Sequence, residues 1–188
     1  MAEPRFGVAD TPLDGLKLVT RTRLGDQRGF LSRLFCADEL GAAGLAGPVV
    51  QINQTMTQQS GTIRGLHFQY APFQEDKYIS VISGEIFDVA VDLRAGSPTF
   101  LRWHAERLSA DNRRSFLIPK GFAHGFQTLT PDCELIYLHT QRYESSAEDA
   151  LNPLDPLLSI DWPLPVTEMS ERDRAHPMLT SDFTGLLP

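Results

Sequence analysis

The middle of the chain alternates between apolar and polar residues with a period of two, which is typical of half-buried β-strands. Five segments follow this pattern: residues 62–69, 78–82, 86–93, 115–118 and 133–139. Glycine and proline separate them, which predicts a tight hairpin at Ser83-Gly84-Glu85 and further corners at Pro98, Pro119 and Gly121. Because these strands are short and spaced about ten residues apart, they predict a β-sandwich or barrel rather than a parallel sheet with crossover helices.

Helical patterns are rare in this sequence. Residues 37–45 predict a helix of about two turns and residues 145–151 one of about a single turn, and the chain beyond them is rich in proline. The chain has 188 residues and no repeat, low-complexity tract or linker, so one domain over residues 1–188 is expected. The prediction is an all-β fold with a few short helices near the termini.

The composition excludes several classes of protein. A formal net charge of −7 leaves no excess of lysine and arginine to displace counterions from a nucleic acid, so a general nucleic-acid binder is not expected. No apolar run approaches the ~18 residues of a membrane span, and residues 1–10 lack a basic region followed by an apolar core. Cys36 and Cys133 form no CxxC pattern. We therefore expect a soluble cytoplasmic domain that does not bind membranes.

Two segments carry candidate chemistry. Residues 61–69 (GTIRGLHFQ) contain His67, and residues 119–126 (PKGFAHGF) contain His124. Each histidine stands beside aromatic residues at or near the end of an expected strand. If the two strands belong to one barrel, the two imidazoles face the same interior.

Charged residues accompany these strands. Arg64 and His67 are three positions apart, so a regular strand would place them on opposite faces, whereas a bulge at Gly65 would turn both inward. Because lysine and arginine are rarely buried without a partner, Arg64, Lys77 and Asp88 inside one barrel would require an anionic ligand or one another. The alternative is that Arg64 and Lys77 point outward as solvated charges and that His67 is a structural residue.

The spacing of the two histidines resembles that of the cupin jelly roll. Gly61 and His67 match the first cupin motif, and residues 119–124 match the Pro-x-Gly-x-x-His turn of the second. Gln69 stands where many cupins carry a second histidine ligand, and Glu75 is a loose match to their glutamate ligand. A neutral amide is a poor ligand for a transition metal, so we predict no metal and no other cofactor.

Several longer motifs resemble the dTDP-4-dehydrorhamnose 3,5-epimerase family, and they occur in order from about residue 12 to residue 178. The central ones are residues 64–69 (RGLHFQ), 84–94 (GEIFDVAVDLR), 97–100 (SPTF) and 118–126 (IPKGFAHGF). Shorter pieces flank them at residues 26–30 (DQRGF), 161–163 (DWP) and 170–173 (SERD). The resemblance implies a cupin-type jelly roll and an epimerase that inverts C3 and C5 of a nucleotide-linked 4-keto-6-deoxyhexose.

The resemblance also implies the catalytic residues. His67 matches the general base of the family, and Asp173 matches the carboxylate that orients this histidine. Lys77 matches the cation near the O4 oxyanion, and Tyr137 matches the acid that returns a proton from the other ring face. By residue type alone, Asp173 would be a surface or helix N-terminal residue and Tyr137 a core residue.

The family's substrate contacts are distributed over the whole chain. Matching positions are Arg28 and Arg64 for the diphosphate, Gln51 and Asn53 for the nucleotide pocket, Tyr143 for stacking on the base, and His124, Glu148 and Arg172 for further contacts. Arg33 stands in the nucleotide pocket where many members carry a glutamate, which puts the identity of the base in question. The resemblance further implies a homodimer in which Arg28 and Arg33 lie across the interface.

Three alternatives to a 3,5-epimerase stay open from the sequence. The first is an epimerase that inverts C3 or C5 only, which would use the same fold. The second is a metal-dependent cupin, and the third is a sugar-binding protein without catalytic activity.

Overall fold

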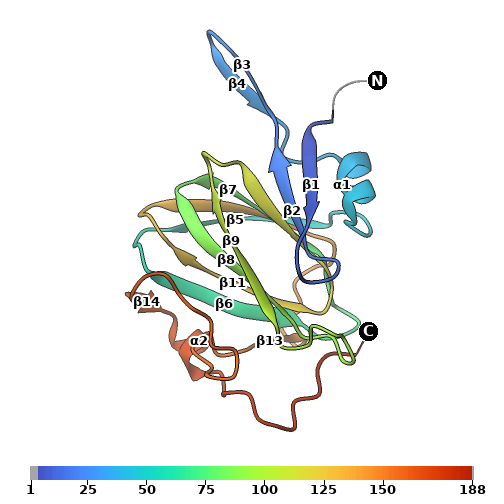
Figure 1. The fold of residues 1–188 in the computed structure, drawn as a ribbon, viewed down its shortest axis with the longest axis vertical. Helices are drawn as coiled ribbons and strands as arrows, with labels where there is room; N and C mark the ends of the chain where they lie inside the picture. The colour runs from blue at the N-terminus through green and yellow to red at the C-terminus, as the bar shows by residue number, and fades with distance from the viewer. Residues whose placement is uncertain (1–3, 188) are drawn as a thin grey trace.

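Two six-stranded β-sheets face each other in the computed structural model, which describes residues 4–187 (Figure 1). The first sheet has the order β1 (Phe6–Asp10), β2 (Lys17–Arg21), β10 (Arg114–Ile118), β7 (Lys77–Ser83), β12 (Cys133–His139) and β5 (Gln51–Thr57). The second has the order β13 (Glu148–Ala150), β6 (Thr62–Gln69), β11 (Phe122–Thr128), β8 (Glu85–Asp92) and β9 (Trp103–Ser109), and β14 (Glu168–Met169) pairs with β6. The all-β jelly-roll sandwich predicted from the sequence is confirmed.

The remaining elements are small. A hairpin of β3 (Arg23–Asp26) and β4 (Gly29–Ser32) projects beyond the end of both sheets (Figure 1). The two helices of residues 4–187 are α1 (Ala37–Ala43) and α2 (Glu171–Ala175), which confirms the expectation of short helices near the termini. Neither helix of the described part is long and apolar enough to cross a membrane.

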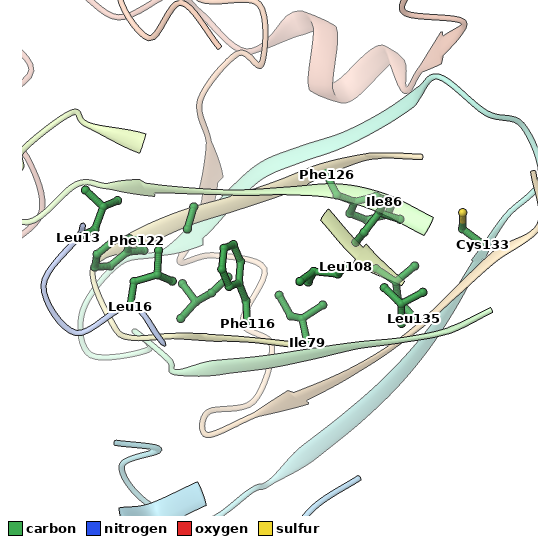
Figure 2. Close-up of a cluster of buried hydrophobic side chains, with 13 residues drawn as sticks. Leu13, Leu16, Ile79, Ile86, Leu108, Phe116, Phe122, Phe126, Cys133 and Leu135 are labelled. Carbon is green, nitrogen blue, oxygen red and sulfur yellow. The ribbon is translucent and has the colours of Figure 1, made fainter. Parts of the chain in front are cut away.

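The alternation of side chains along the strands builds the core between the sheets. On β7, Ile79 points inward and Tyr78 outward, and on β10 Phe116 points inward and Leu117 outward. The inward residues join those of the second sheet, such as Phe126, in one buried cluster (Figure 2). Burying each such side chain contributes roughly 2–3 kcal/mol of hydrophobic stabilisation, which is why a period of two in the sequence indicates the fold.

The outer face of each sheet is also covered. Tyr78 and Leu117 pack against Leu40 of α1 on the first sheet. On the second sheet, residues 151–186 form the cover, and the Nε1 of Trp103 donates a 2.8 Å hydrogen bond to the carbonyl of Leu158. This cover holds α2 beside β6, and α2 thereby becomes part of the site described below.

Two sequence predictions of local structure are wrong. Ser83-Gly84-Glu85 is not a hairpin, because β7 pairs with β10 and β12 whereas β8 pairs with β9 and β11. The chain turns at Gly84 from one sheet to the other. Residues 145–151 do not form a helix, because residues 148–150 pair as β13 with the edge of β6. Backbone pairing with a free strand edge outweighs the weak local helical preference.

A bulge on β6 shapes the cavity between the sheets. His67 pairs with His124 and Arg64 with Phe126, so two residues of β6 lie opposite the single residue Gly125. The predicted bulge at Gly65 is therefore confirmed, and Arg64 and His67 both line the cavity. A Cβ on Gly65, which has φ +132°, would lie 2.4 Å from the Cα of Gly125, so only glycine fits at this approach.

The corner after β8 gives a prediction about acid stability. Asp92 is buried and accepts hydrogen bonds from Arg94, Ser97 and Thr99. Although burial acts in the opposite direction, these bonds lower the pKa of Asp92 to about 2 from its ordinary value of 3.8. Because folding lowers this pKa, the ionised carboxyl stabilises the folded state. The stabilisation is complete when the pH is above the ordinary pKa, and it is lost as the pH falls towards 2. For Asp92 the contribution is about 2 kcal/mol.

We expect Asp92→Asn to lower the urea midpoint at pH 6, and the midpoints of variant and wild type to converge near pH 2. The measurement is urea unfolding at several pH values between 6 and 2. Asp111→Asn, at an exposed turn position, is the control and should leave the midpoint unchanged. A deficit of the Asp92→Asn variant that stays constant over this pH range would contradict the assignment.

Candidate active site

A cavity of about 430 Å³ lies between the sheets, and most of the predicted site residues line it. These are Asn53, Arg64, His67, Lys77, His124, Tyr137, Tyr143, Glu148, Arg172 and Asp173. The first sheet provides residues from β5, β7 and β12, and the second provides residues from β6, β11 and β13. Their inward positions follow from strand alternation, which places every second residue of a strand on the same face.

His67 and Asp173 form a hydrogen-bonded pair. The Nε2 of His67 lies 2.8 Å from Oδ1 of Asp173, and the His67 side chain is 33% exposed whereas that of Asp173 is 5% exposed. Asp173 lies in the first turn of α2, where its backbone N–H is capped by the hydroxyl of Ser170. An ionised carboxylate only accepts, so Nε2 of His67 carries the proton and the lone pair is on Nδ1.

The charge state of Asp173 supports this assignment. Burial alone would raise the pKa of Asp173, but the hydrogen bond and charge of His67, together with contacts from Gly65 and Ser170, lower it below the ordinary value. Asp173 is therefore ionised at neutral pH. Its hydrogen bond to Nε2 fixes the tautomer and the orientation of the imidazole.

A second histidine–carboxylate pair lies deeper in the cavity. The Nε2 of His124 is 2.7 Å from Oδ1 of Asp88, and both side chains are buried. Within residues 4–187 the other oxygen of Asp88 has no hydrogen-bond partner, and burial raises the pKa of this carboxyl. Of the two candidate partners that the sequence analysis named with it, Arg64 and Lys77, neither forms an ion pair with Asp88 among the described residues; its contact is with His124.

Tyr137 lies on the wall opposite His67, because β12 and β6 belong to different sheets. Its ring is edge-on to His124 and parallel to His139, each with centroids 6.0 Å apart. Burial raises the pKa of Tyr137, and the negative charge of Asp88 raises it further. The phenol is therefore protonated at neutral pH and available as a proton donor.

Lys77 begins β7 and reaches into the same cavity. Its side chain is 11% exposed, and its Nζ donates a 3.3 Å hydrogen bond to the backbone carbonyl of His67. Arg64 also lines the cavity. The two cations offer N–H donors to an anionic ligand, although carboxylates such as Glu75 and Glu148 line the same cavity.

Three polar residues are joined in another part of the cavity wall. Glu148 of β13 accepts hydrogen bonds from the hydroxyl of Tyr143, at 2.8 Å, and from the guanidinium of Arg172. Burial alone would raise the pKa of Glu148, but these bonds and the charges of Arg172 and His67 lower it. Tyr143 is 53% exposed, so its ring is accessible for stacking on a planar group.

Three predicted substrate residues do not line this cavity. Arg28 lies in the turn between β3 and β4, where it pairs with Asp26, and its side chain is 88% exposed. Arg33 pairs with Glu39 of α1. Gln51 lies beside the cavity and hydrogen-bonds the lining residue Asn53 at 3.2 Å.

Sequence reasoning gave no catalytic or substrate role to Glu75 and His139, although both line the cavity. His139 follows Tyr137 by two positions on β12, so the period of two was a usable signal for it. Gln69, at the position of a cupin metal ligand, instead bonds the backbone of Phe73 and Glu144. Among residues 4–187, no three histidine, cysteine or acidic side chains gather closely enough to hold a metal ion.

Comparison with known proteins agrees with this geometry. A relative from Methanothermobacter thermautotrophicus, a dTDP-4-dehydrorhamnose 3,5-epimerase, is 42% identical over 93% of this chain and 94% of its own length. A dTDP-4-dehydrorhamnose 3-epimerase from Streptomyces niveus is 34% identical over 94% of this chain and 86% of its own. The crystal structure of a dTDP-6-deoxy-D-glucose-3,5-epimerase from Legionella pneumophila, in complex with dTDP-4-keto-L-rhamnose, has a TM-score of 0.87 and 41% identity. That match covers 92% of each chain.

The family model for dTDP-4-dehydrorhamnose 3,5-epimerase matches residues 10–181, which include every strand from β2 to β14 and helix α2. With a matching fold, and with relatives that align over nearly their whole length, the chain belongs to the dTDP-4-dehydrorhamnose 3,5-epimerase family of cupin-like isomerases.

Proposed function

We propose that this protein inverts both C3 and C5 of a nucleotide-linked 4-keto-6-deoxyhexose, converting dTDP-4-dehydro-6-deoxy-D-glucose to dTDP-4-dehydro-L-rhamnose. The observation that carries the proposal is the placement of His67 and Tyr137 on facing walls of one cavity. Inversion at a carbon requires removal of a proton from one face and delivery of a proton to the other. A base and an acid on opposite walls meet this requirement.

The chemistry uses the C4 carbonyl that lies next to both carbons. His67 takes the proton from C3 or C5, and the electrons of the broken C–H bond move into an enolate with its negative charge on O4. The ammonium of Lys77, whose side chain is largely buried, stabilises this charge. Tyr137 then donates its proton to the same carbon from the opposite face, the C4 carbonyl forms again, and His67 and Tyr137 recover their starting protonation states through solvent.

The nucleotide end of the substrate fits the other polar residues of the cavity. Arg64 offers a guanidinium to the diphosphate, and Tyr143 offers an accessible ring to the base. Asn53, His124, Glu148 and Arg172 supply further hydrogen-bonding groups.

We further propose that the protein works as a homodimer. The hairpin of β3 and β4 exposes Phe30 and Leu31 at 61% and 70%, and the edge strand β5 exposes Ile52 and Met56. Exposed apolar side chains on a hairpin and on an edge strand favour association. Docking of the hairpin on a second copy would bring Arg28 and Arg33 to the partner's nucleotide pocket.

The dimer is tested by sedimentation velocity on the wild type and on the double variant with Phe30→Asp and Leu31→Asp. We expect a dimer for the wild type, and a folded monomer with a raised KM for the variant. A monomeric wild type with full activity would refute the dimer.

The activity is tested by incubating the protein with dTDP-4-keto-6-deoxyglucose in D₂O and following H3 and H5 by NMR. We expect deuterium at both carbons and formation of the lyxo product. Exchange at one carbon alone would favour a single-centre epimerase. If no exchange occurs, the assay is repeated with CDP, GDP and UDP sugars, because Arg33 puts the identity of the base in question. Absence of exchange with these sugars as well would favour a sugar-binding protein.

Tyr137→Phe should separate proton removal from proton delivery. The variant keeps the ring and its packing against His124 but lacks the proton, so we expect inversion to slow by about 10²-fold while exchange slows less. The measurement is the ratio of product formed to deuterium incorporated. Tyr70→Phe removes a hydroxyl bonded to Asp149 outside the cavity and should leave this ratio unchanged. Equal slowing of exchange and inversion would contradict the role of Tyr137 as the acid.

A further inference from the structure

A buried carboxylate that the proposed mechanism does not use lies beside Lys77. The Glu75 side chain is 8% exposed, and its Oε1 lies 3.4 Å from the Nζ of Lys77. Its other oxygen, Oε2, lies 2.8 Å from the Nδ1 of His139. Glu75 therefore connects a cation and an imidazole on one wall of the cavity.

The environment of His139 determines which nitrogen carries the proton. An ionised Glu75 only accepts, so Nδ1 of His139 donates to it, and Nε2 is left as an acceptor for the Nδ2 amide of Asn53 at 3.4 Å. The His139 ring is also parallel to the ring of Tyr137, with an interplanar angle of 10°. Hydrogen bonds and packing together hold His139 in one orientation.

This contact continues towards the residues assigned to the nucleotide. The Oδ1 of Asn53 accepts from Nε2 of Gln51 at 3.2 Å, and the Oε1 of Gln51 accepts from the backbone N–H of Tyr143 at 3.1 Å. A chain of polar contacts thus runs from Lys77 through Glu75 and His139 to Tyr143. It begins at the side chain proposed to stabilise the oxyanion and ends at the backbone N–H of the residue whose ring is proposed to stack on the base.

Two contacts of the protein hold the ammonium of Lys77 in place. Its Nζ donates a hydrogen bond to the backbone carbonyl of His67, and it lies within ion-pair distance of Glu75. An ammonium has three N–H donors, so Nζ keeps donors for an oxygen atom in the cavity. A flexible lysine whose ammonium is held at two contacts is fixed in position before the reaction, which is the kind of preorganisation that oxyanion stabilisation requires.

We propose that Glu75 is a positioning residue for Lys77, and that His139 fixes Glu75 in place. The inference rests on the proposed function, because it assigns to Lys77 the charge that develops on O4. Glu75 does not touch the substrate in this proposal, so its loss should lower kcat and leave KM nearly unchanged.

The kinetic test is a double-mutant cycle with Glu75→Gln and Lys77→Met. We expect Glu75→Gln alone to lower kcat about 10-fold, and to have no further effect when Lys77→Met is already present. His139→Phe keeps an aromatic ring against Tyr137 but loses the bond to Glu75, so it should lower kcat in the same direction. Multiplicative effects of the two substitutions would overturn the proposal, as would a Glu75→Gln variant with wild-type kcat.

The chain offers a matched control for Glu75. Glu106 also connects a histidine and a cation, with His104 and Arg114 each at 3.2 Å, but it lies on β9 and does not line the cavity. Glu106→Gln removes the same charge from the same kind of contact. It should leave kcat and KM unchanged.

An independent measurement does not require activity. The chain has three lysines, Lys17, Lys77 and Lys120, so NMR of lysine labelled with ¹³C at Cε gives three signals, and Lys77→Met identifies one of them. We expect Glu75→Gln to move the Lys77 signal and Glu106→Gln to leave it in place. If the Lys77 signal does not move in Glu75→Gln, the contact between Glu75 and Lys77 is refuted, whether or not the enzyme is active. If the signal moves but the wild type shows no epimerase activity, only the proposed reaction is refuted.

Discussion

His67→Ala should abolish deuterium exchange at both C3 and C5 and lower kcat by about 10³-fold or more. The substitution removes the imidazole that is hydrogen-bonded to the ionised carboxylate of Asp173. The other imidazole on that wall, His124, is paired with the buried carboxyl of Asp88 instead. The measurement is NMR in D₂O with the nucleotide sugar, together with steady-state kinetics of product formation.

Two controls make this result specific. His104→Ala removes a histidine that pairs with Glu106 outside the cavity, and it should keep wild-type exchange. Binding of dTDP to His67→Ala, measured by calorimetry, should be retained because the nucleotide contacts are unchanged. Exchange that survives in a folded His67→Ala protein would show that another residue is the base.

Lys77→Met should lower kcat by about 10²- to 10³-fold while the protein still binds dTDP. Methionine keeps much of the volume of the lysine side chain but lacks the ammonium that the mechanism places near O4. Without this cation the enolate forms at a higher energy, so exchange and inversion should slow together. This distinguishes the variant from Tyr137→Phe, in which inversion slows more than exchange.

The same kinetic and exchange measurements test Lys77→Met. Lys120→Met is the matched control, because Lys120 is exposed and does not line the cavity between the sheets. It should retain wild-type kcat. A Lys77→Met variant that keeps its kcat but binds dTDP more weakly would place Lys77 at the diphosphate instead of at O4.

The strands and the inward direction of their side chains could be predicted from the sequence, because burial of one face imposes a period of two. The bulge on β6 was also predictable, since Arg64 and His67 could share the cavity only with an extra residue between them. The partner of each strand was not predictable in the same way. Gly84 indicates a turn, but whether the flanking strands pair or enter different sheets depends on the whole topology.

In the candidate site, too, local sequence patterns predict single residues but not which distant residues come together. His67 and Asp173 are 106 positions apart, so no local pattern relates them, and the resemblance to a family of epimerases was needed to place them together. Arg28 and Arg33 illustrate the converse. The resemblance assigned Arg28 to the diphosphate and Arg33 to the nucleotide pocket, but Arg28 lies in the turn of the hairpin and Arg33 pairs with Glu39, both away from the cavity of their own chain.

The segment that carries β14 and α2 both covers an edge of β6 and contributes to the site, so its loss has two effects. One edge of β6 is paired with β11, and the other is covered by β13, β14 and the backbone of Leu151. Loss of residues 167–187 would remove β14 and α2, and with them the partner of His67. A prematurely released polypeptide would then expose part of an open strand edge, which is a template for pairing with other chains. Truncated product should therefore be recognisable by self-association as well as by lack of activity.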